Sequence, residues 1–153
     1  MSPKIIVYID MDHTLSDYDA GFRHHQSLHP DLEFPQSMPG MFLDLEPVPG
    51  AIEAYLWLNS HPRLDVYILT APSEMNPHSY SEKRLWVEKH LGMEVVRKLI
   101  ISPNKGLNRG DFLIDDYICG RGQENFEGKI LQFGSDEFPD WQAVIGFFKR
   151  LLE

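Results

Sequence analysis

The chain of 153 residues has a single cysteine, Cys119, so no disulfide can form within it. It also lacks any apolar run approaching the roughly 20 residues that a membrane-spanning helix needs. Its first residues show no basic segment followed by an apolar one, so we expect neither a membrane anchor nor secretion. Because a lone thiol is typical of reducing compartments, the sequence predicts a cytoplasmic protein.

Positive charge is scarce as well, since 14 Lys and Arg residues stand against 23 Asp and Glu residues, for a net charge of −9. Proteins bind nucleic-acid polymers largely by releasing counterions with basic residues, and this chain is poorly suited to that. A small phosphorylated ligand remains compatible with the charge if a metal ion and a few nearby cations offset the negative field.

Short apolar segments alternate with stretches of helical periodicity, and no repeat, low-complexity tract or long linker interrupts them. The expected strands are residues 4–10, 64–69, 96–101, 111–114 and 129–133. The expected helices are residues 17–28, 49–60, 80–91 and 139–152, the third of them with Leu85, Val87 and Leu91 on its buried side. This alternation predicts an α/β fold, a three-layer sandwich around a mainly parallel, Rossmann-like sheet, in one domain over residues 1–153.

The segment from Pro30 to Pro49 is irregular and carries five prolines. We expect it to lie over the carboxyl edge of the sheet and, with the helix before it, to form a reduced cap over roughly residues 16–48. Four apolar side chains of this segment either cover a substrate or pack within the loop: Phe34, Met38, Met41 and Phe42.

Polar residues follow four of the predicted strands. They are Asp10 and Asp12 after the first strand, Thr70 after the second, Lys105 beyond the third, and Asp115 with Asp116 after the fourth. The carboxyl ends of parallel strands lie at one edge of a sheet, so these side chains are expected to converge. Two carboxylates at positions i and i+2 are costly at a strand end unless a cation lies between them.

This combination of groups indicates phosphoryl transfer. Mg²⁺ prefers oxygen ligands, which Asp10, the backbone carbonyl of Asp12 and one or both of Asp115 and Asp116 can supply. Beside such a cation, the Asp10 carboxylate can approach an anionic phosphoryl group and attack phosphorus, forming an aspartyl-phosphate. Asp12 is then placed to protonate the leaving oxygen and later to activate water.

The remaining candidates bind the substrate. Thr70 and the backbone of Ala71 would hold non-bridging phosphoryl oxygens, and Lys105 would neutralise charge. Taken singly, each signal is weak, because Asp115 and Asp116 also suit an Asx turn or a helix cap. Their order along the chain favours a phosphoryl-transfer site.

The motif Asp10-Met11-Asp12-x-Thr14-Leu15 resembles the first motif of the haloacid dehalogenase superfamily of phosphatases, and Thr70, Lys105 and Asp115-Asp116 resemble its second, third and fourth motifs. Three longer stretches resemble the 5′(3′)-deoxyribonucleotidase branch of that superfamily. They are Leu45 to Ala51 with Glu53 and Ala54, Leu85 to Lys89, and Leu113 to Asp116.

The resemblance implies Mg²⁺-dependent dephosphorylation of nucleoside monophosphates through an aspartyl-phosphate, with Asp116 as the direct metal ligand of its pair. The chain departs from that branch in two places. The segment between Leu15 and Leu45 is much shorter than the helical cap that supplies its base pocket, which leaves Tyr18, Phe22 and Phe42 as aromatic candidates. His13 stands where family members usually have Gly, and its side chain could touch the substrate or narrow the mouth of the site.

Two other functions are open. One is a phosphatase of the same superfamily for a sugar phosphate, a phospholipid headgroup or a phosphoprotein. The other is a module that binds Mg²⁺ and phosphate without turnover. Trp57, Trp86 and Trp141 are expected in the core. A final apolar group either seals the sheet or forms a homodimer contact: Phe147, Phe148, Leu151 and Leu152.

Overall fold

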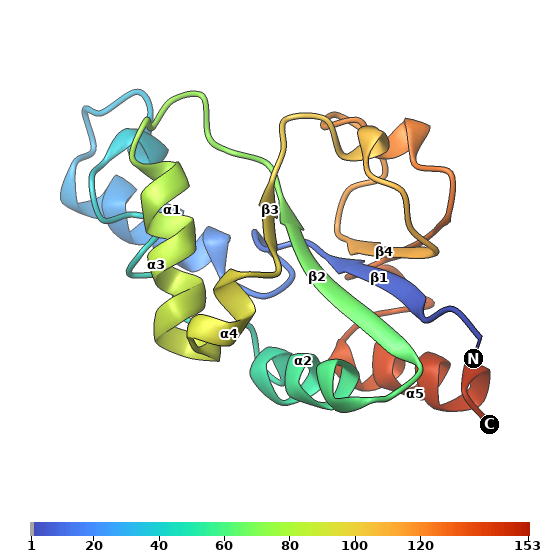
Figure 1. The fold of residues 1–153 in the computed structure, drawn as a ribbon. Helices are drawn as coiled ribbons and strands as arrows, with labels where there is room; N and C mark the ends of the chain where they lie inside the picture. The colour runs from blue at the N-terminus through green and yellow to red at the C-terminus, as the bar shows by residue number, and fades with distance from the viewer. Residues whose placement is uncertain (1) are drawn as a thin grey trace.

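The computed structural model describes residues 2–153 and contains one five-stranded, fully parallel sheet of order β3-β2-β1-β4-β5 (Figure 1). The strands are β1 (Ile5–Ile9), β2 (Leu64–Thr70), β3 (Leu99–Ile101), β4 (Phe112–Asp115) and β5 (Lys129–Gln132). The first strand is central and pairs with β2 and β4, as expected for its continuous run of apolar residues. The predicted α/β fold class is confirmed.

Helices cover the two faces of the sheet unequally. The helices are α1 (Tyr18–Leu28), α2 (Ala51–Ser60), α3 (Ser79–Leu91), α4 (Met93–Val96) and α5 (Trp141–Leu151), with 3₁₀ turns η1 (Pro35–Ser37), η2 (Lys105–Leu107) and η3 (Gln123–Asn125). Val7 and Ile9 of β1 pack into a large core with residues of α2, α3 and α5, and α2 and α5 run side by side beneath the sheet in Figure 1. Tyr8 faces the opposite side, where Phe126, just after η3, covers a smaller core.

The start of one predicted strand and one predicted buried residue are wrong. The strand expected over 96–101 begins only at Leu99, because Gly92, with a φ of +94°, ends α3 and the chain then forms one turn of helix, α4. Val95 lies on that turn and is buried, so its apolar side chain packs from a helix and not from a strand. On α3, Leu85 is 39% exposed, whereas Glu82 and Lys83 are buried.

The C-terminal helix seals the sheet. Phe148 is fully buried and packs edge-to-face on Phe112 of β4, with ring centroids 5.4 Å apart. Trp141, at the start of the same helix, is buried and donates from Nε1 to the carbonyl of Thr14 at 2.8 Å. Leu151 is 39% exposed, and a homodimer contact through this helix stays a prediction. Among residues 2–153, no helix has both the length and the apolar character that crossing a membrane requires.

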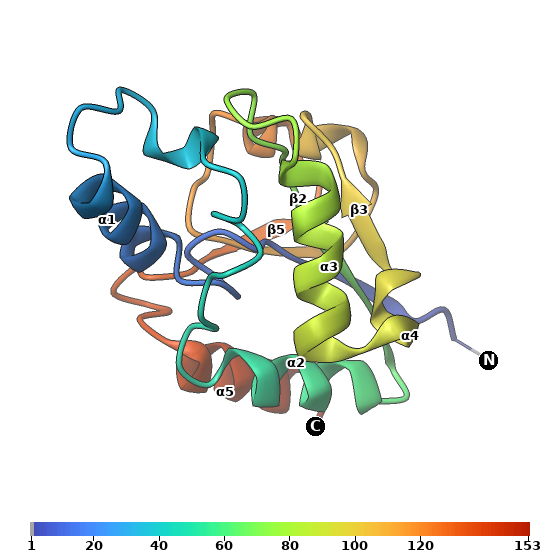
Figure 2. The same cartoon turned by 90° about the vertical axis from the view of Figure 1, so that its left-hand side faces the viewer.

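Helix α3 holds the proline-rich segment in place beside the carboxyl edge of the sheet. The buried Glu82 carboxylate accepts from the backbone N–H groups of Gly40, at 3.0 Å, and Phe42, at 3.1 Å. Trp86 Nε1 donates to the carbonyl of Leu45 at 2.8 Å. Figure 2 shows this segment leaving α1 and passing beside α3. The segment is therefore packed against the domain by hydrogen bonds to one helix.

Replacing Glu82 with alanine is expected to lower the free energy of unfolding by about 2 kcal/mol, because two N–H groups lose a charged acceptor. Hydrogen exchange at Gly40 and Phe42 is expected to accelerate at the same time. Urea unfolding and amide exchange measure the two effects. Glu88→Ala is the matched control on α3, since Glu88 forms only a partly exposed i,i+4 pair with Arg84. Equal losses in the two variants would contradict this account of the segment.

Candidate active site

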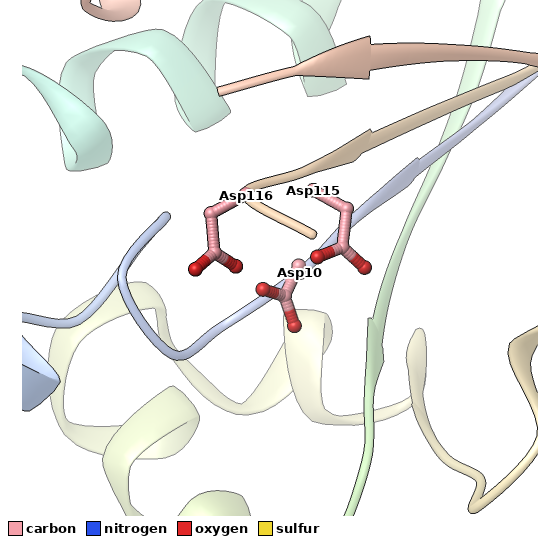
Figure 3. Close-up of side chains that lie close together, drawn as sticks. All are labelled: Asp10, Asp115 and Asp116. Atoms are coloured by element: carbon pink, nitrogen blue, oxygen red, sulfur yellow. The ribbon is translucent and has the colours of Figure 1, made fainter. Parts of the chain in front are cut away.

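Three carboxylates meet where β1 and β4 end. Asp10 directly follows β1, Asp115 is the last residue of β4, and Asp116 comes next. Because Ile9 and Ile114 are paired across these neighbouring strands, the sheet itself brings the three side chains together. One oxygen from each lies within 4.8 Å of the others, and Figure 3 shows the three groups pointing toward one another.

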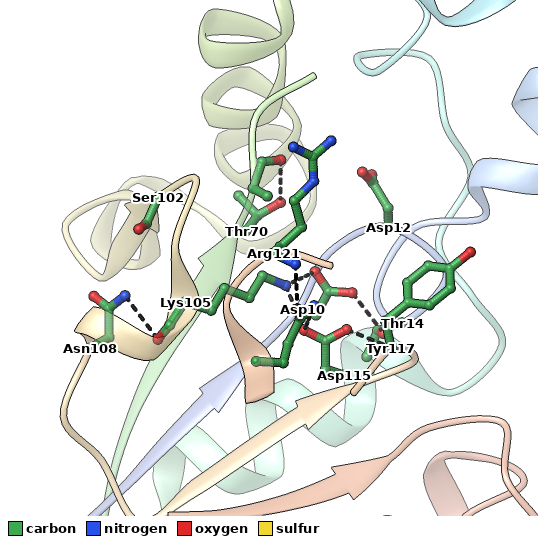
Figure 4. Close-up of polar contacts among 12 residues, drawn as sticks. Asp10, Asp12, Thr14, Thr70, Ser102, Lys105, Asn108, Asp115, Tyr117 and Arg121 are labelled. Atoms are coloured by element: carbon green, nitrogen blue, oxygen red, sulfur yellow. Dashed lines mark hydrogen bonds and ion pairs between the residues drawn. The ribbon is translucent and has the colours of Figure 1, made fainter. Parts of the chain in front are cut away.

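Lys105, from η2, lies between two of these carboxylates. Its Nζ donates to Asp10 Oδ1 at 2.7 Å and to Asp115 Oδ2 at 2.6 Å (Figure 4). The lysine is 2% exposed, and its backbone N–H donates to the carbonyl of Arg121 at 2.7 Å. A buried ammonium therefore supplies positive charge directly to Asp10.

Burial and mutual repulsion separate the pKa values of the three acids. Burial opposes charge on Asp10, but the ammonium of Lys105 outweighs it and holds the pKa of Asp10 below its ordinary value. Burial, and next the charge of Asp10, raise the pKa of Asp115 to about 6 and that of Asp116 to about 9. Burial lowers the pKa of Lys105, but Asp10 and Asp115 together raise it to about 12. When all three acids are ionised, the single ammonium of Lys105 does not neutralise them, so the deprotonated cluster favours a further cation.

The donor atoms fit a divalent metal ion. Within residues 2–153, the buried Oδ1 of Asp116 has no hydrogen-bond partner. Both oxygens of Asp115 are partnered, by the Tyr117 N–H on one side and by Lys105 and Gln123 on the other. The orphaned oxygen of Asp116 beside Asp10 is the ligand type that hard cations prefer, so these two carboxylates can hold a metal.

Asp12 lies outside the three-carboxylate cluster and contacts a lysine that sequence reasoning missed. Its Oδ2 accepts from Lys83 Nζ at 3.0 Å, and the same Nζ donates to Thr70 Oγ1 at 2.7 Å. Lys83 is fully buried on α3. The sequence does indicate that Lys83 is buried, because Lys83 stands three residues before Trp86 and four before Val87, and this spacing places all three on one face of the helix.

A cleft of about 300 Å³ opens above these groups. Its lining comprises Asp10, Asp12, His13, Tyr18, Gln36, Phe42, Ala71, Pro72, Ser73, Glu74, Met75, Lys105, Asp115, Asp116, Tyr117, Arg121 and Gln123. At the mouth, Arg121 and Glu74 form an ion pair at 3.1 Å, and neither residue was singled out from the sequence.

Only some of the other residues predicted to contact the substrate line the cleft. Tyr18 and Ala71 line the cleft, whereas Thr70 is fully buried and its hydroxyl lies against Lys83, outside the lining. Of the four apolar residues of the proline-rich segment, only Phe42 lines the cleft. Met41 is fully buried in the large core.

A parallel sheet with carboxylates and a buried lysine at its carboxyl edge fits the phosphoric monoester hydrolase that the sequence predicts. The chain belongs to the family described as 5′ nucleotidase, deoxy (pyrimidine), cytosolic type C, whose model matches residues 23–138. The predicted resemblance is thereby confirmed.

The chain is similar to several named proteins over nearly its whole length. It is 42% identical over 147 residues to a protein of Vibrio phage KVP40 provisionally named 5′(3′)-deoxyribonucleotidase, covering 94% of this chain and 84% of that one. It is 33% identical over 174 residues to the human cytosolic-type 5′(3′)-deoxyribonucleotidase, covering 95% and 81%. A haloacid dehalogenase-like hydrolase of Burkholderia xenovorans LB400 aligns with a TM-score of 0.49 and 17% identity, over 84% of this chain and 80% of that one.

Replacing Lys83 with methionine is expected to lower kcat by about 10²-fold, the scale of a lost general acid–base contribution, because Asp12 loses the cation that orients it. Steady-state phosphate release measures the effect. Lys89→Met is the matched control, since Lys89 is exposed on the same helix. A kcat within threefold of the wild type in Lys83→Met would show that Asp12 is positioned without the lysine.

Proposed function

We propose that this protein is a Mg²⁺-dependent phosphomonoesterase that removes the phosphate of nucleoside monophosphates, in particular of 5′-deoxyribonucleotides. Membership of a nucleotidase family supports this proposal. The observation that carries it is the buried contact of Asp10 with Lys105, at 2.7 Å, next to the orphaned oxygen of Asp116. It provides an ionised nucleophile and a cation ligand side by side.

Asp10 would attack phosphorus and break the bond to the ester oxygen, and Asp12 would protonate that oxygen as it leaves. In the second step Asp12 would take a proton from water, which attacks the aspartyl-phosphate and releases inorganic phosphate. Lys105 would neutralise charge on Asp10 and on the phosphoryl group. Mg²⁺, held by Asp10, Asp116 and the carbonyl of Asp12, would stabilise negative charge on the phosphoryl oxygens.

The substrate contacts would come from three parts of the chain. Tyr18 and Phe42, with ring centroids 6.0 Å apart, form an aromatic surface on the cap side of the cleft. The N–H of Ala71 would hold phosphoryl oxygens, whereas Thr70, which lies outside the cleft lining, would position Lys83 through its hydroxyl. Residues 16–48 would act as a reduced cap within a single domain, and the single, exposed Cys119 suits a protein that works in the cytoplasm.

The proposal is tested by measuring phosphate release from a panel of 5′-deoxyribonucleotides, ribonucleotides and sugar phosphates, with Mg²⁺ and with EDTA. We expect turnover only with Mg²⁺ and a clear preference for deoxynucleotides. Faster turnover of sugar phosphates would assign the chain to another substrate class of the same superfamily. Binding of Mg²⁺ and phosphate with no turnover on any ester would make it a binding module.

The stabilisation by Mg²⁺ is expected to grow as pH rises from 6 to 8.5. Burial and then the neighbouring acids raise the pKa of Asp116 to about 9, far above the roughly 3.9 of an unfolded chain, so the metal-free protein loses stability as pH rises toward 9. A metal ligand must be deprotonated, so Mg²⁺ competes with that proton less at high pH. Thermal shifts measured at both pH values test this, with Asp116→Asn as the variant that abolishes the pH trend. A larger shift at pH 6 would contradict the prediction.

A further inference from the structure

His13 is the one non-glycine residue within 2–153 that has a positive φ, at +67°. Side chains adopt this left-handed region at a cost, whereas glycine enters it freely. The turn after Asp12 imposes the conformation: the N–H groups of Thr14, Leu15 and Ser16 all donate to the carbonyl of Met11, and His13 donates back to Ser16. The backbone of this turn therefore suits glycine, and the imidazole is additional.

The imidazole of His13 connects two walls of the cleft. Its centroid lies 5.0 Å from the Tyr18 ring and 6.3 Å, edge to face, from the Tyr117 ring. Its Nδ1 lies 3.5 Å from Asp19 Oδ1. Tyr18 and Asp19 belong to α1 in the cap, whereas Tyr117 follows β4, where Figure 4 shows it next to the carboxylates. The ring thus fills the gap between cap and sheet on one side of the cleft.

The neighbours of His13 would keep that gap open if the ring were removed. Tyr18 is held from behind by Phe22 and Phe42, each with a ring centroid 6.0 Å away, so it has little room to move. Across the mouth, the ion pair of Glu74 and Arg121 limits the cleft on the side of the β2–α3 loop. The resulting volume of about 300 Å³ lies at the small end of the roughly 300–1,000 Å³ typical of small-molecule sites.

We propose that the His13 ring sets the size of substrate that the cleft accepts, favouring nucleoside monophosphates with a single-ring base over those with a double-ring base. This inference rests on the proposed nucleotidase function and adds to it a residue that determines selectivity. The imidazole acts by occupying space between Tyr18 and Tyr117, which a glycine at this position would leave to the substrate. Size exclusion by one side chain in a pocket is worth about 10- to 200-fold in selectivity.

The test compares kcat/KM for dGMP and dUMP in the wild type, His13→Gly and His13→Asn, with Mg²⁺ present. Glycine and asparagine both tolerate a positive φ, so both variants keep the turn while removing the ring. We expect the dGMP-to-dUMP ratio of kcat/KM to rise at least tenfold in His13→Gly and by an intermediate factor in His13→Asn. His29→Gly is the matched control, since His29 is exposed at the end of α1 and does not line the cleft.

Each outcome separates the two proposals. A ratio within twofold of the wild type in both variants overturns the role of His13 and leaves the nucleotidase function standing. An equal loss of kcat/KM on both nucleotides also overturns it, because that pattern assigns His13 to the shape of the Asp12 turn. A wild-type enzyme that releases no phosphate from either nucleotide overturns both proposals.

Discussion

Replacing Asp10 with asparagine is expected to reduce phosphate release by about 10⁴-fold or more, the scale seen when a covalent nucleophile is removed. Asparagine has the size of aspartate but is a far weaker nucleophile and a poor metal ligand. In the structure Asp10 is also the carboxylate with the lowered pKa, because Lys105 donates to it at 2.7 Å. The variant therefore removes the one carboxylate of the cluster whose pKa is lowered, which lies next to Lys105, Asp115 and Asp116.

The measurement is single-turnover phosphate release from the preferred nucleotide with saturating Mg²⁺. Asp136→Asn, at an exposed position outside the cleft, serves as the matched control and is expected to behave like the wild type. Circular dichroism checks that Asp10→Asn remains folded. More than about 1% residual turnover in Asp10→Asn would exclude an aspartyl-phosphate at Asp10, because the loss of a covalent nucleophile lowers the rate by far more than about 100-fold.

Replacing Lys105 with methionine is expected to lower the free energy of unfolding by about 3–5 kcal/mol, the usual loss when one partner of a buried ion pair is removed. The Lys105 ammonium is 2% exposed and is shared by Asp10 and Asp115, so its removal leaves two buried carboxylates without a counter-charge. The loss is expected to shrink as pH falls, because protonation neutralises those carboxylates.

A second substitution tests the cause of that loss. The double variant Lys105→Met/Asp115→Asn also removes one of the two buried carboxylates that lack a counter-charge. Part of the lost stability is therefore expected to return, while turnover stays low. Urea unfolding of the two single variants and the double variant gives the coupling energy between the residues. Additive losses would show that Lys105 stabilises the fold by packing alone and would contradict the electrostatic account.

The positions of Asp10 and Asp116 at the sheet edge could be predicted because each depends on a local pattern. A run of β-branched and apolar residues predicts β1, and whatever follows a parallel strand lies at the carboxyl edge of the sheet. The same reasoning placed the start of β3 too early, because Val96 belongs to the single helical turn α4. Such a short apolar run suits a strand or a buried helical turn equally well, and only packing separates the two.

Helix α3 illustrates what local patterns miss. The helical spacing predicts a buried Leu85, but Leu85 is 39% exposed, and Glu82 and Lys83 are buried instead. Charged residues enter a core only when partners neutralise or hydrogen-bond them. Those partners are the Gly40 and Phe42 amides for the glutamate, and Asp12 with Thr70 for the lysine. These partners lie about 13 to 71 residues away in the chain, so no spacing within the helix predicts them.

The order of strands and the residue types that follow them were enough to predict the class of this protein, because backbone geometry at a strand end is a short-range property. Only the tertiary structure shows which groups pair: Lys105 with Asp115, and Lys83 with Asp12. It also shows that one oxygen of Asp116 has no partner among residues 2–153, and that the imidazole of His13 lies between two tyrosines. The physical reason is that charge compensation and cavity shape depend on distances between segments remote in sequence, which no local pattern specifies.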